Sequence, residues 1–388
     1  MIAEFERLYP SAEGLRVFRA PGRVNVIGEH TDYNCGFVLP MALEMAAYVA
    51  TAPSGDGKLR LYSEDRKEMR EFEAAGLMDL SPAHHWTDYP IGVARELIRL
   101  GFAIAPANLL IRATVPDGSG LSSSAALEVS SALAFLNRRP IARLELAKLC
   151  QRSEHNFVGV PCGIMDQYIS VFGREHSAVE IDCRSLGHRY VSLPAGVAFI
   201  AVNTMVKHAL AGSAYKDRVR ECGAAVEILK TQYPAIESLR DVTPDELETA
   251  AQLLPDVVGR RARHIVTENV RVNRFVEASE AADLAAMGRL LVESHHSLQY
   301  DYQVSCEELD FLAEAALAID GVYGSRMTGG GFGGCTVTML RAEAAAHFRE
   351  RISIAYQERY GVVPRIYDCK PAAGAAECES FETIPALV

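Results

Sequence analysis

The stretch Val115-Pro-Asp-Gly-Ser-Gly-Leu-Ser-Ser-Ser-Ala-Ala126 joins the strand-like run Asn108–Thr114 to the helical pattern Leu127–Leu136. Gly118 and Gly120 allow the backbone to approach an anion closely, and the helix N-terminus supplies free N–H groups. The stretch therefore predicts a phosphate-binding loop between a strand and a helix. An ordinary glycine-rich turn with a serine cap is the alternative. It is not a Walker A loop, because the Lys-Ser/Thr ending is missing.

Around this loop the hydrophobic patterns change along the chain. Short apolar runs at Leu59–Tyr62 and Ala178–Asp182 are typical of strands, while Ile141–Glu154 has the periodicity of a helix. From about residue 218 onward the chain is rich in Ala, Glu and Leu and is expected to be mainly helical. This mixture predicts an α+β fold.

The length of the chain predicts two lobes. Its 388 residues exceed the size at which one hydrophobic core usually keeps growing. The Pro-Ala-Gly turn within Leu193–Gly196 marks a boundary, so we expect lobes at residues 1–195 and 196–388 with a cleft between them.

A second polar segment, Ala20-Pro-Gly-Arg-Val-Asn-Val-Ile-Gly-Glu-His-Thr-Asp-Tyr-Asn34, interrupts a short apolar strand. Glu29, His30 and Asp32 offer donors and acceptors that could pair with the hydroxyls of a sugar ring. Arg23 could stand beside a reacting centre and offset negative charge. A surface loop with scattered charges is the alternative reading of this segment.

Two further features point to chemistry. Gly329-Gly-Gly-Phe-Gly-Gly334 either binds a ligand through backbone N–H groups or lets two segments approach closely. Asp166 lies beside the apolar residues Ile164 and Met165, in a segment suited to burial. A buried carboxylate needs a partner, and Arg23 is the natural candidate.

The composition limits the kinds of partner. Fifty acidic and 39 basic residues give a formal net charge of −11, which would repel nucleic acid. No apolar run has the length of a membrane span, and the N-terminus lacks the pattern of a secretory signal. The nine cysteines are scattered and contain no C-x-x-C pair, so reduced thiols are expected. We therefore expect a cytoplasmic, monomeric protein that acts on small molecules.

Together the motifs resemble those of galactokinases in the GHMP kinase superfamily, from about Glu4 to the C-terminus. The matching stretches are Gly22 to Asn34, Gly120-Leu-Ser-Ser-Ser-Ala-Ala126, Pro161-Cys-Gly-Ile-Met-Asp-Gln167, Tyr215-x-x-Arg218-x-x-x-Cys222 and Met327 to Gly334. The resemblance implies a two-lobed fold, with a ribosomal-S5-like N-terminal lobe and a ferredoxin-like C-terminal lobe around an active-site cleft.

The resemblance also implies roles for single residues. Arg23 would stabilise the transition state, and Asp166 would be the catalytic acid or base. The sugar-binding residues would be Glu29, His30, Thr31, Asp32, Gly163 and Tyr215. The ATP-binding residues would be Ser63, Trp86, Gly118, Ser119, Gly120, Leu121, Ser122, Ser123 and Ser124. Magnesium would be held by Ser124 and Glu154.

The implied reaction is ATP-dependent phosphorylation of the anomeric hydroxyl of galactose, the first committed step of galactose catabolism in the Leloir pathway. Two departures from the family pattern, Cys35 and Gln299-Tyr-Asp-Tyr302, leave the exact sugar less secure. Alternatives are a kinase for N-acetylgalactosamine, for arabinose, or for a non-sugar alcohol such as mevalonate or homoserine. A non-catalytic sensor of galactose and ATP is a further alternative, although sensors tend to lose part of the serine loop.

Overall fold

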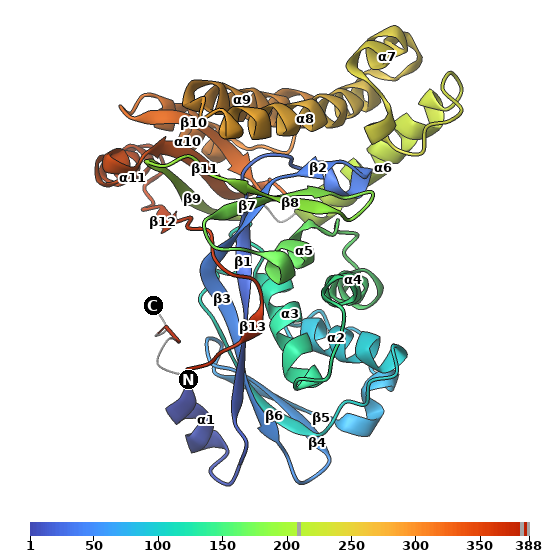
Figure 1. The fold of residues 1–388 in the computed structure, drawn as a ribbon, viewed down its shortest axis with the longest axis vertical. Coiled ribbons are helices and arrows are strands. Elements are labelled where there is room, and N and C mark those ends of the chain that lie inside the picture. The colour runs from blue at the N-terminus through green and yellow to red at the C-terminus, as the bar shows by residue number, and fades with distance from the viewer. Residues whose placement is uncertain (208–210, 381–383, 386–388) are drawn as a thin grey trace.

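The computed structural model describes residues 1–207, 211–380 and 384–385. A six-stranded sheet with the order β13-β1-β3-β6-β4-β5 forms the lower half of the molecule in Figure 1. Its strands are β1 (Arg16–Asn25), β3 (Pro40–Pro53), β4 (Lys58–Ser63), β5 (Glu68–Glu73), β6 (Ala107–Ala113) and β13 (Ala376–Glu377). The apolar run that predicted a strand before the phosphate loop is β6, which lies between β3 and β4.

Helices cover one face of this sheet. They are α2 (Asp88–Arg99), α3 (Ser123–Leu136), α4 (Arg143–Ser153) and α5 (Met165–Phe172). Helix α3 contacts β1 and β3, and its buried Val129 and Ala132 share a core with Leu109 and Ile111 of β6. Because this apolar side is held by the sheet, the N-terminus of α3 is fixed at the end of the phosphate loop.

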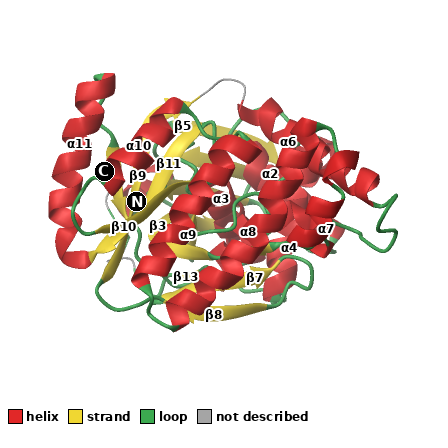
Figure 2. Cartoon of the chain, turned by 90° about the horizontal axis from the view of Figure 1, so that it is seen from above, coloured by secondary structure: helices red, strands yellow, loops and turns green. Residues whose placement is uncertain are grey.

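The second half of the chain builds a four-stranded sheet with the order β10-β11-β9-β12. Its strands are β9 (Val197–Lys207), β10 (Val322–Thr328), β11 (Gly333–Arg341) and β12 (Arg365–Asp368). The helices of this half are α6 (Ala211–Leu229), α7 (Pro244–Thr249), α8 (Asp256–Glu280), α9 (Leu284–His296), α10 (Glu307–Leu317) and α11 (Ala345–Tyr360). Seen from above in Figure 2, α11 and α7 lie at opposite ends of the molecule.

A small sheet of β2 (Phe37–Val38), β7 (Ser177–Asp182) and β8 (His188–Ser192) completes the strands, and α1 (Ile2–Leu8) begins the chain. After β12 the chain returns to the first sheet, where β13 pairs with β1. There Glu377 accepts hydrogen bonds from the guanidinium of Arg16 at 2.9 and 2.8 Å. The expected lobe boundary after residue 195 stays a prediction.

The structure confirms the α+β class and the strands and helices expected within it. Leu59–Tyr62 lies in β4, Ala178–Asp182 lies in β7, and the centre of Ile141–Glu154 is α4. All nine cysteines are free thiols, as expected. In the residues that the structure describes, no helix combines the length and the apolar character that crossing a bilayer requires.

Helix α9 lies unusually close to strand β10, and two glycines make this possible. A Cβ atom added to Gly288 of α9 would collide with the carbonyl oxygen of Tyr323, and one added to Gly324 of β10 would collide with the backbone of Gly288. We therefore expect Gly288→Ala to destabilise the protein by about 1–3 kcal/mol through overpacking. Thermal unfolding followed by circular dichroism measures the effect.

The matched control is Gly223→Ala in α6, where an added Cβ meets no atom within 4 Å. Alanine favours a helix over glycine by roughly 0.5–1 kcal/mol, so this variant should melt at or above the wild-type temperature. Equal melting temperatures for Gly288→Ala and wild type would contradict the tight packing of α9 on β10.

Candidate active site

Two adjoining pockets lie beside the phosphate loop, with volumes of about 820 and 180 Å³. Val160 lines both of them, so they are neighbours. The larger pocket contains the expected nucleotide residues Ser63, Trp86, Gly118, Ser123 and Ser124. The smaller pocket contains Arg23, Asp166, Glu154 and the expected sugar residues Glu29, His30, Asp32, Gly163 and Tyr215. The sequence motifs thus meet in space as two compartments with different side chains.

Strand β1 brings Arg23 to the phosphate loop through a break in its pairing. The register between β1 and β3 shifts between Pro21 and Arg23, and a Cβ added to Gly22 would lie 2.6 Å from the carbonyl oxygen of Leu121. The backbone N–H of Arg23 donates to that same oxygen at 3.0 Å. The Pro-Gly pair in the strand therefore lets the loop dock onto the sheet edge.

The side chain of Arg23 forms a two-point ion pair with Asp166, at the first turn of α5. Nε donates to Oδ1 at 2.8 Å, and the second guanidinium nitrogen donates to Oδ2 at 2.7 Å. Arg23 also donates to the carbonyl oxygen of Gly120, and Ser122 donates to Asp166. Burial opposes the charge of Arg23, but the carboxylates of Asp166 and, to a smaller extent, Glu29 and Asp32 together outweigh it and raise the pKa of Arg23. The pairing expected from the sequence is present.

The three serines of the loop point to different places. Ser122, at the N-cap of α3, has left-handed backbone angles (φ 61, ψ 52), and its hydroxyl faces Asp166. Ser123 and Ser124 begin the helix and line the larger pocket. Ser119 donates to the carbonyl oxygen of Pro116 at 2.8 Å, and Leu121 is fully buried. Ser119, Gly120, Leu121 and Ser122 thus shape the loop without lining the larger pocket.

Residues 29–32, the sugar loop, which the family resemblance assigns to the sugar, are held in place by the second half of the chain. One carboxylate oxygen of Glu29 accepts from the N–H of Gly329 at 2.9 Å, the hydroxyl of Thr328 at 3.0 Å and the guanidinium of Arg326 at 3.3 Å. Thr31 is buried and lines neither pocket. Its hydroxyl contacts the carbonyl oxygens of Gly28 and Phe37 at 2.9 and 2.6 Å, so it supports the loop.

The glycine-rich third motif gains a definite role in packing. A Cβ on Gly329 would lie 2.9 Å from the carbonyl oxygen of Gly120, and one on Gly334 would lie 3.0 Å from that of Ser119. Of the two readings left open by the sequence, close approach of two segments is confirmed. The N–H of Gly329 nevertheless also binds Glu29, as described above.

Aromatic side chains surround His30 in the smaller pocket. Its Nδ1 lies 2.9 Å from the hydroxyl of Tyr33, which lies 2.6 Å from that of Tyr302. The ring of Tyr215 lies 5.5 Å from that of His30 between centroids. Burial lowers the pKa of His30 to about 3, so the imidazole is neutral at physiological pH.

Acidic groups gather on the other side of the smaller pocket. Burial, followed by the charge of Asp166, raises the pKa values of Asp32 and Glu154 to about 7 each. The amide nitrogen of Gln167 donates to Glu154 at 2.7 Å and to the fully buried Glu128 at 3.0 Å. The described residues contain no group of three or more His, Cys, Asp or Glu side chains that could hold a metal by themselves.

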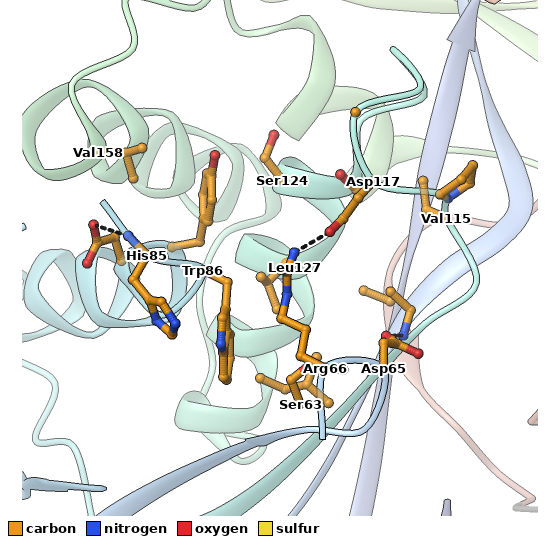
Figure 3. Close-up of a pocket in the computed structure, with 18 of the residues that line it drawn as sticks. Ser63, Asp65, Arg66, His85, Trp86, Val115, Asp117, Ser124, Leu127 and Val158 are labelled. Carbon is orange, nitrogen blue, oxygen red and sulfur yellow. Dashed lines mark hydrogen bonds and ion pairs between the residues drawn. The ribbon is translucent and has the colours of Figure 1, made fainter. Parts of the chain in front are cut away.

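Several of these residues were missed in the sequence. Glu128 and Gln167 form a polar bridge behind Glu154, and Arg326 is fully buried beneath Glu29. The one available signal for Glu128 was that it is the single charged residue in the sequence of α3. Figure 3 shows another missed pair in the larger pocket, where Arg66 reaches across to Asp117.

The known proteins that this chain resembles include galactokinases. A family description, "Galactokinase galactose-binding signature", matches residues 3–53, and the GHMP kinase N-terminal and C-terminal domains match residues 88–174 and 275–358. A galactokinase of Roseiflexus sp. (strain RS-1) is 46% identical over 360 residues, with 92% of each chain covered. A galactokinase of Chloroflexus aggregans is 45% identical, with 96% of each chain covered.

Solved structures give the same result. The crystal structure of Lactococcus lactis galactokinase complexed with galactose has a TM-score of 0.92 and 34% identity, and covers 96% of this chain and 98% of that one. A mevalonate kinase, at 16% identity and a TM-score of 0.66, shares the fold alone. The two-lobed GHMP kinase fold and the resemblance in the motifs are thereby confirmed, and the chain belongs to the galactokinase family of GHMP kinases.

Proposed function

We propose that the protein transfers the γ-phosphoryl group of ATP to the anomeric hydroxyl of α-D-galactose and releases galactose 1-phosphate and ADP. The observation that carries the proposal is the Arg23–Asp166 pair. It contacts the phosphate loop at Gly120 and Ser122, and it also lines the smaller pocket. The reaction would be the first committed step of galactose catabolism.

The two pockets divide the substrates. We place the adenine near Trp86 and Ser63 in the larger pocket and the phosphates at the N-terminus of α3, where free N–H groups and the helix dipole favour anions. The sugar then occupies the smaller pocket, with Glu29, His30, Asp32, Gly163 and Tyr215 around it. In this arrangement the acceptor hydroxyl and the γ-phosphate meet at the pair formed by Arg23 and Asp166.

Phosphoryl transfer depends mainly on positioning and electrostatics. Asp166 orients the anomeric hydroxyl and is placed to accept its proton. Arg23 supplies the countercharge of Asp166 and offsets negative charge on the transferring group. Ser122, which already donates to Asp166, fixes the carboxylate relative to the phosphate loop.

The site also fits Mg²⁺, a cation that prefers oxygen ligands and often shares them with substrate phosphates. Ser124 offers a hydroxyl in the larger pocket, and Glu154 offers a carboxylate in the adjoining smaller one. Burial, followed by the charge of Asp166, raises the pKa of Glu154, and Glu128 lies close behind it on the other side of Gln167, so acidic groups gather here. Mg²⁺ bound there would neutralise phosphate charge.

We further propose a monomeric enzyme of the cytoplasm, a compartment that suits nine free cysteines. Release of ADP tests the reaction directly. Galactose, glucose, N-acetylgalactosamine and arabinose are compared at equal concentration with ATP and magnesium. Galactose should give the highest kcat/KM, and absence of ADP release with every sugar would favour a sensor.

Replacing Asp166 should separate binding from turnover. We expect Asp166→Asn to lower kcat by about 10²–10⁴-fold, because the amide keeps the shape but loses the charge that faces Arg23 and the acceptor hydroxyl. Calorimetry should still detect galactose binding. Asp320→Asn, at an exposed ion pair with Arg341, is the matched control and should retain wild-type kcat. A wild-type kcat in Asp166→Asn would remove Asp166 from the mechanism.

Replacing Ser124 should affect magnesium more than sugar. We expect Ser124→Ala to raise the magnesium concentration for half-maximal rate about fivefold, the size of one lost oxygen contact. The KM for galactose should change little. Ser123→Ala removes the neighbouring hydroxyl in the same pocket and should shift the magnesium midpoint less. An effect confined to the galactose KM would mean that Ser124 contacts the sugar and does not hold magnesium.

Asp32 should make galactose binding depend on pH. Its pKa of about 7 means that the carboxyl is protonated below pH 7 and ionised above it. Because the ionised form is the better acceptor for sugar hydroxyls, galactose affinity without nucleotide should rise between pH 6 and 8. Asp32→Asn should flatten this profile and narrow the preference for galactose over glucose. An unchanged profile would exclude Asp32 as its source.

The same carboxyl group should make the folded protein less stable as pH rises, whereas it makes galactose binding stronger. The folded state keeps a proton on Asp32 between its usual pKa of 3.8 and about 7, whereas the unfolded chain has lost it. Asp32 therefore lowers the free energy of unfolding progressively as pH rises through this window. The melting temperature of Asp32→Asn minus that of wild type should therefore be larger at pH 8 than at pH 5.

A further inference from the structure

The larger pocket has an unusual charge distribution for a nucleotide site. Its described lining contains three aspartates, namely Asp65, Asp88 and Asp117. Arg66 is the single arginine or lysine in that lining. A triphosphate entering the pocket therefore meets one full positive charge on the protein, and its position decides how the phosphates are received.

The backbone that carries Arg66 is firmly placed. Arg66 lies in the turn between β4 and β5, and its N–H donates to the hydroxyl of Ser63 at 3.3 Å. The preceding Asp65 accepts from the N–H of Ala113 at 3.0 Å, which ties the turn to the end of β6. These hydrogen bonds hold the backbone of Arg66 in place beside the pocket, but they do not restrain its guanidinium group.

The guanidinium of Arg66 crosses the pocket to Asp117, the residue before Gly118 of the phosphate loop (Figure 3). The side chains of Arg66 and Asp117 are 48% and 59% exposed. Ion pairs this exposed contribute roughly 0–1 kcal/mol, so the contact is easily exchanged. By contrast, Asp65 and Asp88 accept hydrogen bonds from the backbone N–H groups of Ala113, Ala83 and His85.

We propose that Arg66 is a ligand of the nucleotide phosphates and that Asp117 competes with them for its guanidinium. The inference rests on the proposed function, because it takes the larger pocket to be the ATP site. A guanidinium matches two phosphate oxygens in the same forked geometry in which it binds a carboxylate. A triphosphate carries more charge than Asp117 and displaces it, and Asp117 then repels the bound phosphates.

The competition predicts opposite effects for the two partners. Arg66→Gln weakens ATP binding about five- to tenfold, the size of a half-exposed charged contact. Asp117→Asn strengthens it about two- to fivefold, because the competing carboxylate is gone. Adenosine, which lacks phosphates, binds all variants equally. Arg359→Gln, at an exposed pair with Glu307 far from the pocket, matches the charge change of Arg66→Gln and leaves ATP binding unchanged.

Trp86 makes the measurement direct, since it is the single tryptophan of the chain and lines this pocket. Its emission is followed while ATP, ADP or adenosine is titrated into wild type, each single variant and the double variant. Equilibrium dialysis with labelled ATP provides the same constants independently. Galactose binding that matches wild type shows that each variant is folded.

The double variant separates direct contact from simple charge neutralisation. If Arg66 binds phosphate in competition with Asp117, Arg66→Gln weakens ATP binding in the Asp117→Asn background by more than in wild type, because there Arg66 has no carboxylate to leave. The proposal is overturned if that effect vanishes, if Arg66→Gln binds ATP like wild type, or if adenosine is weakened equally. If wild-type protein binds no ATP by either method, the assignment of the pocket fails and the inference fails with it. ATP binding by wild type together with unchanged binding by Arg66→Gln overturns the inference alone.

Discussion

The ion pair of Arg23 with Asp166 is the interaction on which the site depends. It joins a strand of the first sheet, the first turn of α5 and, through Gly120 and Ser122, the phosphate loop. Each charge of a largely buried ion pair needs the other, because a single buried charge would lose its contacts with water and gain no partner in return. The two side chains therefore stay together while these three elements remain folded.

The second constraint is the contact between the two halves of the chain. Glu29 of the sugar loop is held by Arg326, Thr328 and Gly329 from the end of β10 and the loop that follows it. The same glycine allows this segment to lie against the carbonyl oxygen of Gly120. One junction thus sets the shapes of the sugar loop and the phosphate loop together, which suits a reaction between two bound substrates.

The sequence predicted what local chemistry makes conspicuous. Dense polar residues on a strand, a glycine-serine loop before a helix, and a carboxylate that needs a partner predicted the phosphate loop, the polar segment around Glu29 and the Arg23–Asp166 pair. The other pocket residues, such as Trp86 and Tyr215, were predicted only through the family resemblance. The sequence did not reveal Arg326, whose contacts lie about 300 residues away along the chain. Nor did it reveal Arg66 and Asp117, because exposed charges 51 positions apart look like ordinary surface residues. Thr31 was expected to bind the sugar because it belongs to the polar motif, but its hydroxyl contacts the backbone carbonyl oxygens of Gly28 and Phe37.

In the proposed reaction, both pockets carry more carboxyl groups than guanidinium groups, and the feature that distinguishes them is the N-terminus of α3, whose Ser123 and Ser124 line the larger pocket. The described lining of the smaller pocket has four carboxyl groups, on Glu29, Asp32, Glu154 and Asp166, against the single guanidinium of Arg23. Such a site accepts a neutral polyol, whose hydroxyls donate to these oxygens, but repels a polyanion. The triphosphate is instead favoured at the N-terminus of α3, where N–H groups are free. In the proposed reaction, the terminal phosphate is the part of ATP that reaches the smaller pocket, which Arg23 lines.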